Sequence, residues 1–521
     1  MKRVCLALLG LVLMGSCAEK RAEEGVVETT FGKVSGNINE GIYEFLGIPY
    51  GECERFQAPH DPTPWDTVRI CTKPGPRSNQ DIAGNAFIDQ SKQPELAINC
   101  QNLNVWTANI NNEARKPVMV WLHGGGYTTG SSYQFPYFCG ESMARHSDVV
   151  IVSVNHRLNI EGFLDLSSYG PEYDGSGAAG MLDIVKALEW VHHNIEKFGG
   201  DPGNVTLFGE SGGGGKVGTL MCMPAARGLF HKAIIESGAI QNLMTTENSS
   251  VLGRMVVKQL FGSEDALDKA ALDTLSYARL MQAGQEAVQA LLEGRSAGFS
   301  MFGFSPSADG KNLAQQPYNP GFSEFSKDIP VLIGSNANEL SVMNQRLGLP
   351  IDTNYVANIN RQYGPNAERF IAAFKKAYPE STERDWALTD HVFRARSVES
   401  AKARAAEGGA PAYLNLFTYE APERRGQNAS VHGLEEAFVF DNVELDPTCG
   451  QTEEDYAFEK LMTTIWTNFA KTGDPNTEGL PEWKPVGTDQ VGTMILDSKG
   501  CGMKYDFDNE LQQVILENLN K

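Results

Sequence analysis

Six short apolar runs constrain the fold of this chain more than any other feature. They read VMVWLHGGG, VVIVSVNHR, NVTLFGES, KAIIES, PVLIGSNANE and AYLNLFTYE, and each ends in polar or glycine residues. Near-continuous apolar runs are typical of parallel strands buried on both faces of a sheet, whose functional groups gather at the carboxyl ends. Helical segments separate the runs. The chain is therefore expected to be an α/β protein with one large, mostly parallel sheet.

The segments between the strands indicate how the sheet is covered. Apolar residues spaced by three and four predict one buried face in each of two helices: Ile184, Leu188, Val191, Ile195 and Phe198, and Leu461, Ile465, Trp466 and Phe469. Residues 241–325 and 352–406 are mostly helical in pattern and are expected to cap the sheet. The stretch VVETTFGKVSGNINEGIYEFLGIPYG alternates as antiparallel strands do. Neither repeats nor low-complexity linkers divide the chain, so residues 17–521 are expected to form a single domain.

Composition excludes some classes of partner. The 521-residue chain has a formal net charge of −21, whereas nucleic-acid binding requires clustered Lys and Arg. Its cysteines include no CxxC pair and no zinc-ligand spacing. His192 and Glu196 lie one helical turn apart, but a helix face without a third ligand is the better interpretation. No nucleic acid, metal or cofactor is expected.

The N-terminus predicts export. Two basic residues precede an apolar stretch, Val4–Met14, that is too short to span a bilayer and reads as a signal peptide over residues 1–16. The small residues before Cys17 resemble the lipobox of bacterial lipoproteins, in which the cysteine is lipidated. This favours membrane attachment through a lipid on Cys17, at the bacterial cell envelope. Ordinary cleavage after Ala18 is the alternative, and it gives a secreted or periplasmic protein.

The segment GESGG, Gly209–Gly213, matches the G-x-S-x-G nucleophile elbow. In that motif a strand turns sharply into a helix, and Ser211 is exposed at a strained apex between residues that must lack side chains. The match follows the strand-like VTLF and precedes a helix-like segment, as the motif requires. A second copy at 294–298 follows a helix-like segment and fails this test of context.

A glycine run upstream supplies the second element. His123-Gly124-Gly125-Gly126 follows the strand VMVWL. Acyl transfer develops an oxyanion, and backbone N–H groups approach it best where no Cβ intervenes. Gly125 and Gly126, together with the N–H of Gly212, are expected to form an oxyanion hole. Because Gly212 is expected to begin a helix with negative φ, a Cβ is expected to be tolerated there.

A base and an acid are expected downstream of the serine, in the order Ser, acid, His. His432 follows the strand AYLNLFTYE on a glycine-containing loop and is the best base. His231 opens a buried strand and His391 lies in a helical stretch, so both are expected to be structural. Glu339 follows the strand PVLIG and is the favoured acid; Asp309 in SADGK, the alternative, looks like a turn residue.

The whole pattern resembles the type B carboxylesterases, the cholinesterase-like branch of the α/β-hydrolase fold. The segments that carry the resemblance include FLGIPYG, WLHGGGYTTGSS, NVTLFGESGG, GSNANE and HGLEEAFVF. The resemblance implies a Ser211–Glu339–His432 triad, an oxyanion hole at Gly125, Gly126 and Gly212, helical cap insertions, and no cofactor. The implied activity is hydrolysis of a small carboxylic ester through an acyl-enzyme. The alternative is a non-catalytic cholinesterase-like surface binding protein, against which the complete triad counts.

The chain departs from the family pattern in several places. Gly212 stands where the family usually has Ala. Ile98 replaces the Glu that usually pairs with the Arg of RF, so Arg55 lacks its expected partner. Ser78 replaces a cysteine, which puts the usual disulfide to Cys100 in doubt; Cys71 is a candidate substitute, and the pairing stays open. The natural ester and the oligomeric state are not indicated by the sequence.

Overall fold

The computed structural model describes seven stretches of the chain: residues 25–81, 90–240, 242–294, 303–318, 321–342, 353–422 and 429–520. The predicted signal segment, Cys17, and most of the second G-x-S-x-G copy lie outside these stretches. No helix of the described stretches is long and apolar enough to cross a membrane.

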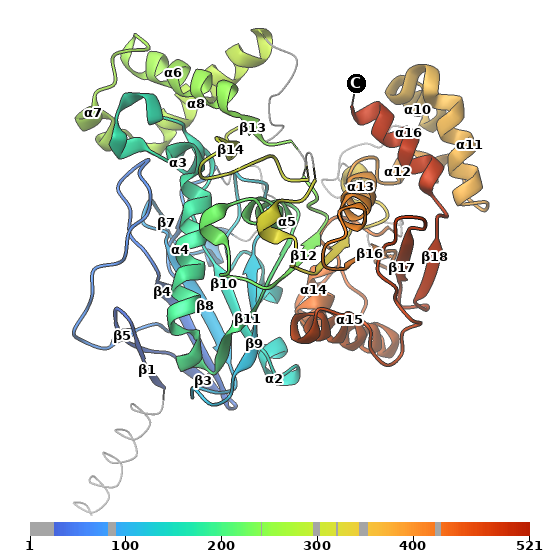
Figure 1. Ribbon diagram of the computed structural model, residues 1–521, viewed down its shortest axis with the longest axis horizontal. Helices are drawn as coiled ribbons and strands as arrows, with labels where there is room; N and C mark the ends of the chain where they lie inside the picture. The colour runs from blue at the N-terminus through green and yellow to red at the C-terminus, as the bar shows by residue number, and fades with distance from the viewer. Residues whose placement is uncertain are drawn as a thin grey trace, which may run out of the picture.

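Eleven strands form one large sheet (Figure 1). In spatial order they are β18 (Gly502–Tyr505), β17 (Gly492–Leu496), β16 (Ala412–Phe417), β15 (Val331–Gly334), β12 (Lys232–Glu236), β11 (Gly200–Glu210), β9 (Lys116–Leu122), β10 (Val150–Val154), β8 (Asn102–Thr107), β4 (Ile42–Pro49) and β3 (Asn37–Asn39). The strands from β17 to β10 are parallel, and antiparallel strands flank them on both sides. All six apolar runs lie in the parallel part, which confirms the expected mostly parallel sheet.

Short strands complete the β structure. β1 (Val26–Thr29) and β2 (Gly32–Ser35) are antiparallel and are joined by β5 (Arg69–Ile70). The two remaining pairs are β6 (Arg77–Ser78) with β7 (Leu96–Ala97), and β13 (Met244–Thr245) with β14 (Ser307–Ala308). The antiparallel N-terminal region is therefore as predicted.

Helices cover both faces of the sheet. Strand β9 shows why: Val118, Val120 and Leu122 face one hydrophobic core, whereas Met119 and Trp121 face the other. The first core includes apolar residues of α4 (Ala179–Asn194), α5 (Gly212–Leu220) and α13 (Phe393–Ala406), and α3 (Asn159–Phe163) packs on α4. The second includes residues of α2 (Glu141–His146), α14 (Glu436–Val439) and α15 (Glu453–Thr472).

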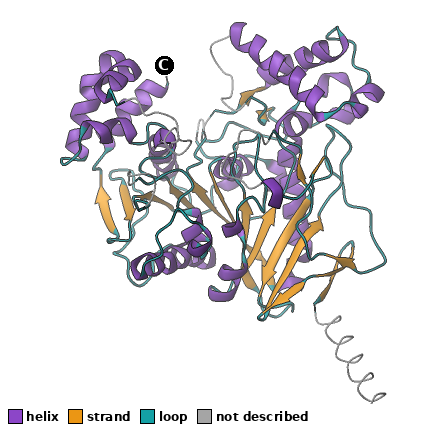
Figure 2. Cartoon of the chain, turned by 180° about the vertical axis from the view of Figure 1, so that it is seen from behind, coloured by secondary structure: helices purple, strands orange, loops and turns teal. Residues whose placement is uncertain are grey.

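Two further groups of helices stand apart from each other in the upper part of the molecule, in both views (Figures 1 and 2). One contains α6 (Thr246–Phe261), α7 (Lys269–Thr274) and α8 (Tyr277–Gly294); the other contains α10 (Tyr355–Tyr363), α11 (Ala367–Ala377), α12 (Glu383–Leu388) and α16 (Asn509–Leu519). The second group has its own small core, built on Phe370 and Trp386. These are the predicted cap segments, with two differences: α13 packs against the sheet strand β16 as well as against α16, and the C-terminal α16 joins a cap.

Candidate active site

The turn from β11 into α5 places Ser211 at its apex. Ser211 has φ 56° and ψ −122°, a conformation in the positive-φ region that costs a non-glycine residue about 1–3 kcal/mol. Its amide donates to the carbonyl of Glu236 on the neighbouring strand at 2.8 Å. A Cβ at Gly209 would lie 2.6 Å from the Gly213 carbonyl carbon, and one at Gly213 would lie 1.9 Å from the Leu122 oxygen. Both glycines are therefore required sterically, as the motif predicts.

The rest of the glycine run lets α5 pack closely on its neighbours. A Cβ at Gly214 would lie 2.9 Å from the Cα of Gly238, and one at Gly215 would lie 2.6 Å from Ile240 Cδ1. Both neighbours follow strand β12. The four consecutive glycines thus bring the first turn of α5 against the carboxyl ends of two strands.

The loop Gly124–Gly126 lies directly beside the serine. Gly125 and Gly126 have φ values of +86° and +64°, which favour glycine. A Cβ on Gly124 would lie 3.4 Å from Ser211 Cβ. The three glycines predicted to hold an oxyanion therefore come together around the elbow.

One expectation at this point is wrong. Gly212 does begin helix α5, but a Cβ there would lie 2.2 Å from the oxygen of Gly126 and 2.4 Å from its nitrogen. The expected tolerance considered only the backbone conformation of Gly212, whereas the obstacle is the loop packed against it.

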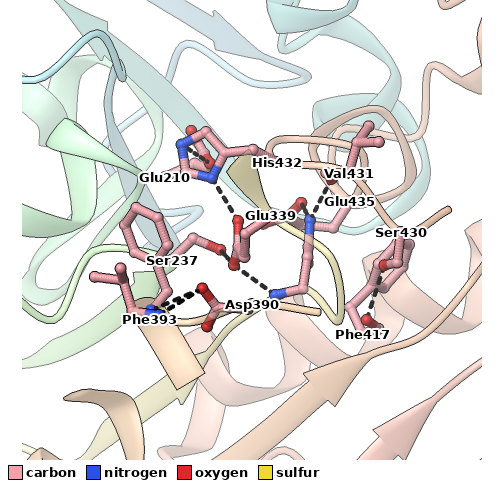
Figure 3. Close-up of polar contacts among 12 residues, drawn as sticks. Glu210, Ser237, Glu339, Asp390, Phe393, Phe417, Ser430, Val431, His432 and Glu435 are labelled. Atoms are coloured by element: carbon pink, nitrogen blue, oxygen red, sulfur yellow. Dashed lines mark hydrogen bonds and ion pairs between the residues drawn. The ribbon is translucent and has the colours of Figure 1, made fainter. Parts of the chain in front are cut away.

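His432 and Glu339 form a close pair at the same edge of the sheet (Figure 3). Glu339 follows β15, bridges to Val431, and is 1% exposed. Its Oε2 lies 2.5 Å from His432 Nδ1, and its Oε1 accepts hydrogen bonds from Ser237 Oγ and from the Asn336 amide, each at 2.6 Å. Since Glu339 accepts at both oxygens, the imidazole Nδ1 carries the hydrogen and Nε2 is presented toward the elbow.

Nε2 of His432 lies 3.2 Å from Oε1 of Glu210, the residue that precedes Ser211. Within the described stretches the Ser211 hydroxyl makes no hydrogen bond. Catalytic hydrogen bonds are often long or misaligned without substrate and tighten in the complex. Glu210 ends β11 and Ser211 follows it at the turn into α5, so His432 Nε2 faces the end of the strand that carries the serine.

Buried carboxyl groups surround this pair. Burial raises the pKa of Glu210 well above its usual range, and the nearby charges of Glu436, Glu435 and Glu339 add to the effect. Burial, followed by the charge of Glu339, raises the pKa of both Glu435 and Asp390 to about 7. The site is therefore rich in buried carboxyl groups that hold their protons more tightly than exposed ones do.

The histidines expected to be structural have partners other than the serine and the acid. His231 precedes β12, at the opposite end of the strand from Ser237, and its Nδ1 accepts from the Val205 amide at 3.1 Å. His391 Nδ1 contacts Tyr363 Oη at 2.7 Å, and burial lowers its pKa to about 4. Asp309 accepts from three backbone amides of its own turn, at 2.8–3.0 Å. His192 is exposed.

Sequence reasoning missed the residues that hold the acid. Ser237 follows β12 with φ 46° and donates to Glu339, and Asn336 Nδ2 donates to Glu435 Oε2 at 2.5 Å. The available signal was their position, since both come within two residues of the end of a buried strand. Arg55, which lacks its family partner, pairs instead with the buried Glu161 at 2.9 Å. Cys71 and Cys100 are free thiols.

An elbow, a glycine loop and a His–Glu pair at the carboxyl edge of a mostly parallel sheet define an α/β-hydrolase. Comparison with known protein families identifies the family. The family model described as "Carboxylesterase family" matches residues 23–514, so the chain belongs to that family. Para-nitrobenzyl esterase of Bacillus subtilis is 34% identical over 94% of this chain and 98% of its own. Carboxylesterase 1C of Rattus norvegicus is 31% identical, and the match covers 88% of this chain and 87% of the rat protein.

The solved structures agree. An esterase from Clostridium hathewayi, described as able to hydrolyse aliphatic aromatic polyesters, superposes with a TM-score of 0.83 at 35% identity, covering 95% of this chain and 98% of its own. A thermophilic PNB esterase superposes with a TM-score of 0.78 at 32% identity, covering 94% and 99%. The protein is a serine hydrolase that acts on carboxylic esters, and the alternative of a non-catalytic binding protein is not favoured.

Proposed function

We propose that Ser211, His432 and Glu339 hydrolyse carboxylic esters as a catalytic triad. The observation that carries the proposal is the 2.5 Å contact between His432 Nδ1 and Glu339 Oε2, beside a serine at a strained strand-to-helix turn. Glu339 fixes the tautomer of the imidazole, so that Nε2 carries the lone pair that accepts a proton.

The reaction follows from these positions. His432 Nε2 leaves Glu210 for Ser211 Oγ and accepts its proton as Oγ attacks the ester carbonyl. Glu339 stabilises the imidazolium, which then protonates the leaving alcohol. Water, activated by the same imidazole, hydrolyses the acyl-enzyme and releases the acid.

The backbone N–H groups of Gly125, Gly126 and Gly212 are proposed to hold the oxyanion. Two of these residues adopt left-handed backbone, and the third begins a helix directly beside them. Donors fixed in a dry site need no reorganisation when charge develops, which makes them effective for the transition state.

The substrates are proposed to be esters with an aromatic group next to the ester bond. The names of two relatives mention para-nitrobenzyl and aliphatic aromatic esters. In this chain, the Phe393 ring lies 5.0 Å from the His432 ring, which offers an aromatic wall beside the base. A matched panel of benzyl and cyclohexylmethyl esters tests the preference: kcat/KM higher for the benzyl member supports it, and equal values contradict it.

Export and attachment through Cys17 are proposed on the N-terminal sequence alone. A labelled fatty acid supplied to a bacterial host that lipidates proteins should enter the wild-type chain and not Cys17→Ala. Absence of label from the wild-type chain would favour ordinary secretion.

Turnover by Ser211→Ala tests the catalytic proposal across the same ester panel. We expect Ser211→Ala to lose hydrolysis of every ester while it keeps the circular dichroism spectrum of the wild type. Residual turnover near the wild-type value would place the chemistry elsewhere.

A further inference from the structure

A lysine is buried behind the proposed oxyanion loop. Lys216 lies in α5, five residues after Ser211, and its side chain is 0% exposed. Its Nζ donates to the carbonyl of His123 at 2.8 Å. His123 is the residue that precedes the Gly124–Gly126 loop, so one short helix carries both the nucleophile and a tether to that loop.

The groups that face Lys216 lie on, or in the loops after, the three strands β9, β10 and β11, and none of them forms an ion pair with it among the described residues. His123 follows β9, His156 follows β10, and the Tyr127 ring centroid lies 6.0 Å from Nζ. Glu210 ends β11 and is close enough to favour the charged lysine. A buried ammonium without a paired carboxylate is unusual, because desolvation disfavours it strongly.

The two histidines add no charge of their own. Their Nδ1 atoms contact the carbonyls of Gly124 and Arg157 at 2.8 and 2.9 Å, so each Nδ1 carries the hydrogen. Burial and the charge of Lys216 lower both pKa values well below the usual range. Each Nε2 is a buried lone pair without a hydrogen-bond partner in the described structure. Lys216 is therefore the group beside these two histidines that can carry a positive charge without a paired carboxylate.

We propose that Lys216, in its ammonium form, is a positioning residue that holds the oxyanion loop in register with the nucleophile helix. The hydrogen bond fixes the His123–Gly124 peptide, from which the loop departs. The positive charge also lies at the base of the loop that carries two of the proposed donors, in a low-dielectric environment where such charges act strongly. This inference rests on the oxyanion loop assigned under the proposed function.

The pH dependence follows from the charge. Burial lowers the pKa of Lys216 to about 7, so the ammonium is lost as pH rises through that value. Wild-type kcat should therefore fall on the alkaline side of neutrality. Because the unfolded chain binds the proton more tightly than the folded one, the same group destabilises the fold at low pH, and this penalty fades as pH rises toward 10.

The test compares Lys216→Met and Lys216→Gln with wild type, each titrated with a fluorophosphonate so that kcat refers to competent serines. We expect kcat of Lys216→Met to fall about 10- to 100-fold, with KM changed less than about threefold. The fall of kcat on the alkaline side of neutrality should disappear in both variants. The melting temperature of Lys216→Met should exceed the melting temperature of wild type at pH 6, and the difference should be smaller at pH 9, as expected for a buried ammonium. The fall in kcat at nearly constant KM and the loss of the alkaline decline in kcat are the results that a merely structural lysine would not produce.

Lys216→Gln keeps an N–H donor without charge and decides the question if Lys216→Met does not fold. A lower kcat without the alkaline decline supports the proposal. Wild-type kcat with an unchanged pH profile in either variant overturns it. Failure of the wild-type serine to react with the fluorophosphonate would instead contradict the proposed triad, so the two failures are distinct.

Discussion

Replacing Gly212 with alanine tests the packing of the oxyanion loop. The added Cβ would lie 2.2 Å from the Gly126 oxygen and 2.4 Å from both its nitrogen and its Cα. Ordinary contact begins at 3.4 Å, so the loop must retreat by about 1 Å. All three atoms belong to the backbone of Gly126 and have no flexible end that can turn aside.

A retreat of this size takes the Gly126 N–H out of line with the oxyanion. Loss of one such donor lowers kcat by about 10²–10³, or roughly 2.7–4 kcal/mol. Overpacking should also lower the stability of the fold by about 1–3 kcal/mol, which exceeds the gain of up to ~1 kcal/mol from reduced unfolded-state entropy. The KM should change less than kcat, since the donor acts mainly in the transition state.

The assay is kcat and KM on one activated aryl ester, with thermal unfolding of the same samples. Gly502→Ala is the matched control, because a Cβ there meets no atom within 4 Å and the backbone φ is not left-handed. A Gly212→Ala enzyme within about threefold of wild-type kcat would refute the steric argument and restore the expectation drawn from the sequence.

Three other perturbations address the acid, the base and the buried carboxyl groups. His432→Ala should lower kcat by about four to six orders of magnitude, whereas His391→Ala should stay near wild type; the reverse pattern would reassign the base. Ser237→Ala should lower kcat about tenfold through loss of one hydrogen bond to the Glu339 carboxylate. Ser430→Ala, the control, removes a side-chain hydrogen bond to the Phe417 carbonyl and should leave kcat unchanged. Equal losses of kcat in the two variants would contradict a special role of Ser237. Because the folded-state pKa of Glu435 is raised to about 7, the stability associated with its bound proton is lost as pH rises through 7. Glu435→Gln should therefore unfold at a higher temperature than wild type above pH 7, with the difference closing toward pH 4; a constant difference would contradict the burial argument.

Much of the fold was predictable because its signals are local. Each parallel strand is buried on both faces, so its apolar run appears directly in the sequence, as in Val331–Gly334. The elbow and the glycine loop are equally local, because backbone sterics dictate their residue types. His432 and Glu339 were found by their position after strands, which the sheet brings to one edge.

The features that were missed depend on contacts between distant segments. The conflict at Gly212 arises from Gly126, more than eighty residues earlier in the chain, and the φ of Gly212 gives no hint of it. The sequence does not indicate that Lys216 is buried, and only the packing of α5 against the strands shows it. The replacement of the usual Arg55 partner by Glu161 is likewise visible only in three dimensions.

Mass spectrometry of the protein after reaction with a fluorophosphonate tests the central claim most directly. The account predicts one adduct per chain, on the peptide that contains Ser211, formed at a rate that falls sharply in His432→Ala. An adduct on another serine, or none on correctly folded protein, would contradict the assignment of Ser211 as the nucleophile.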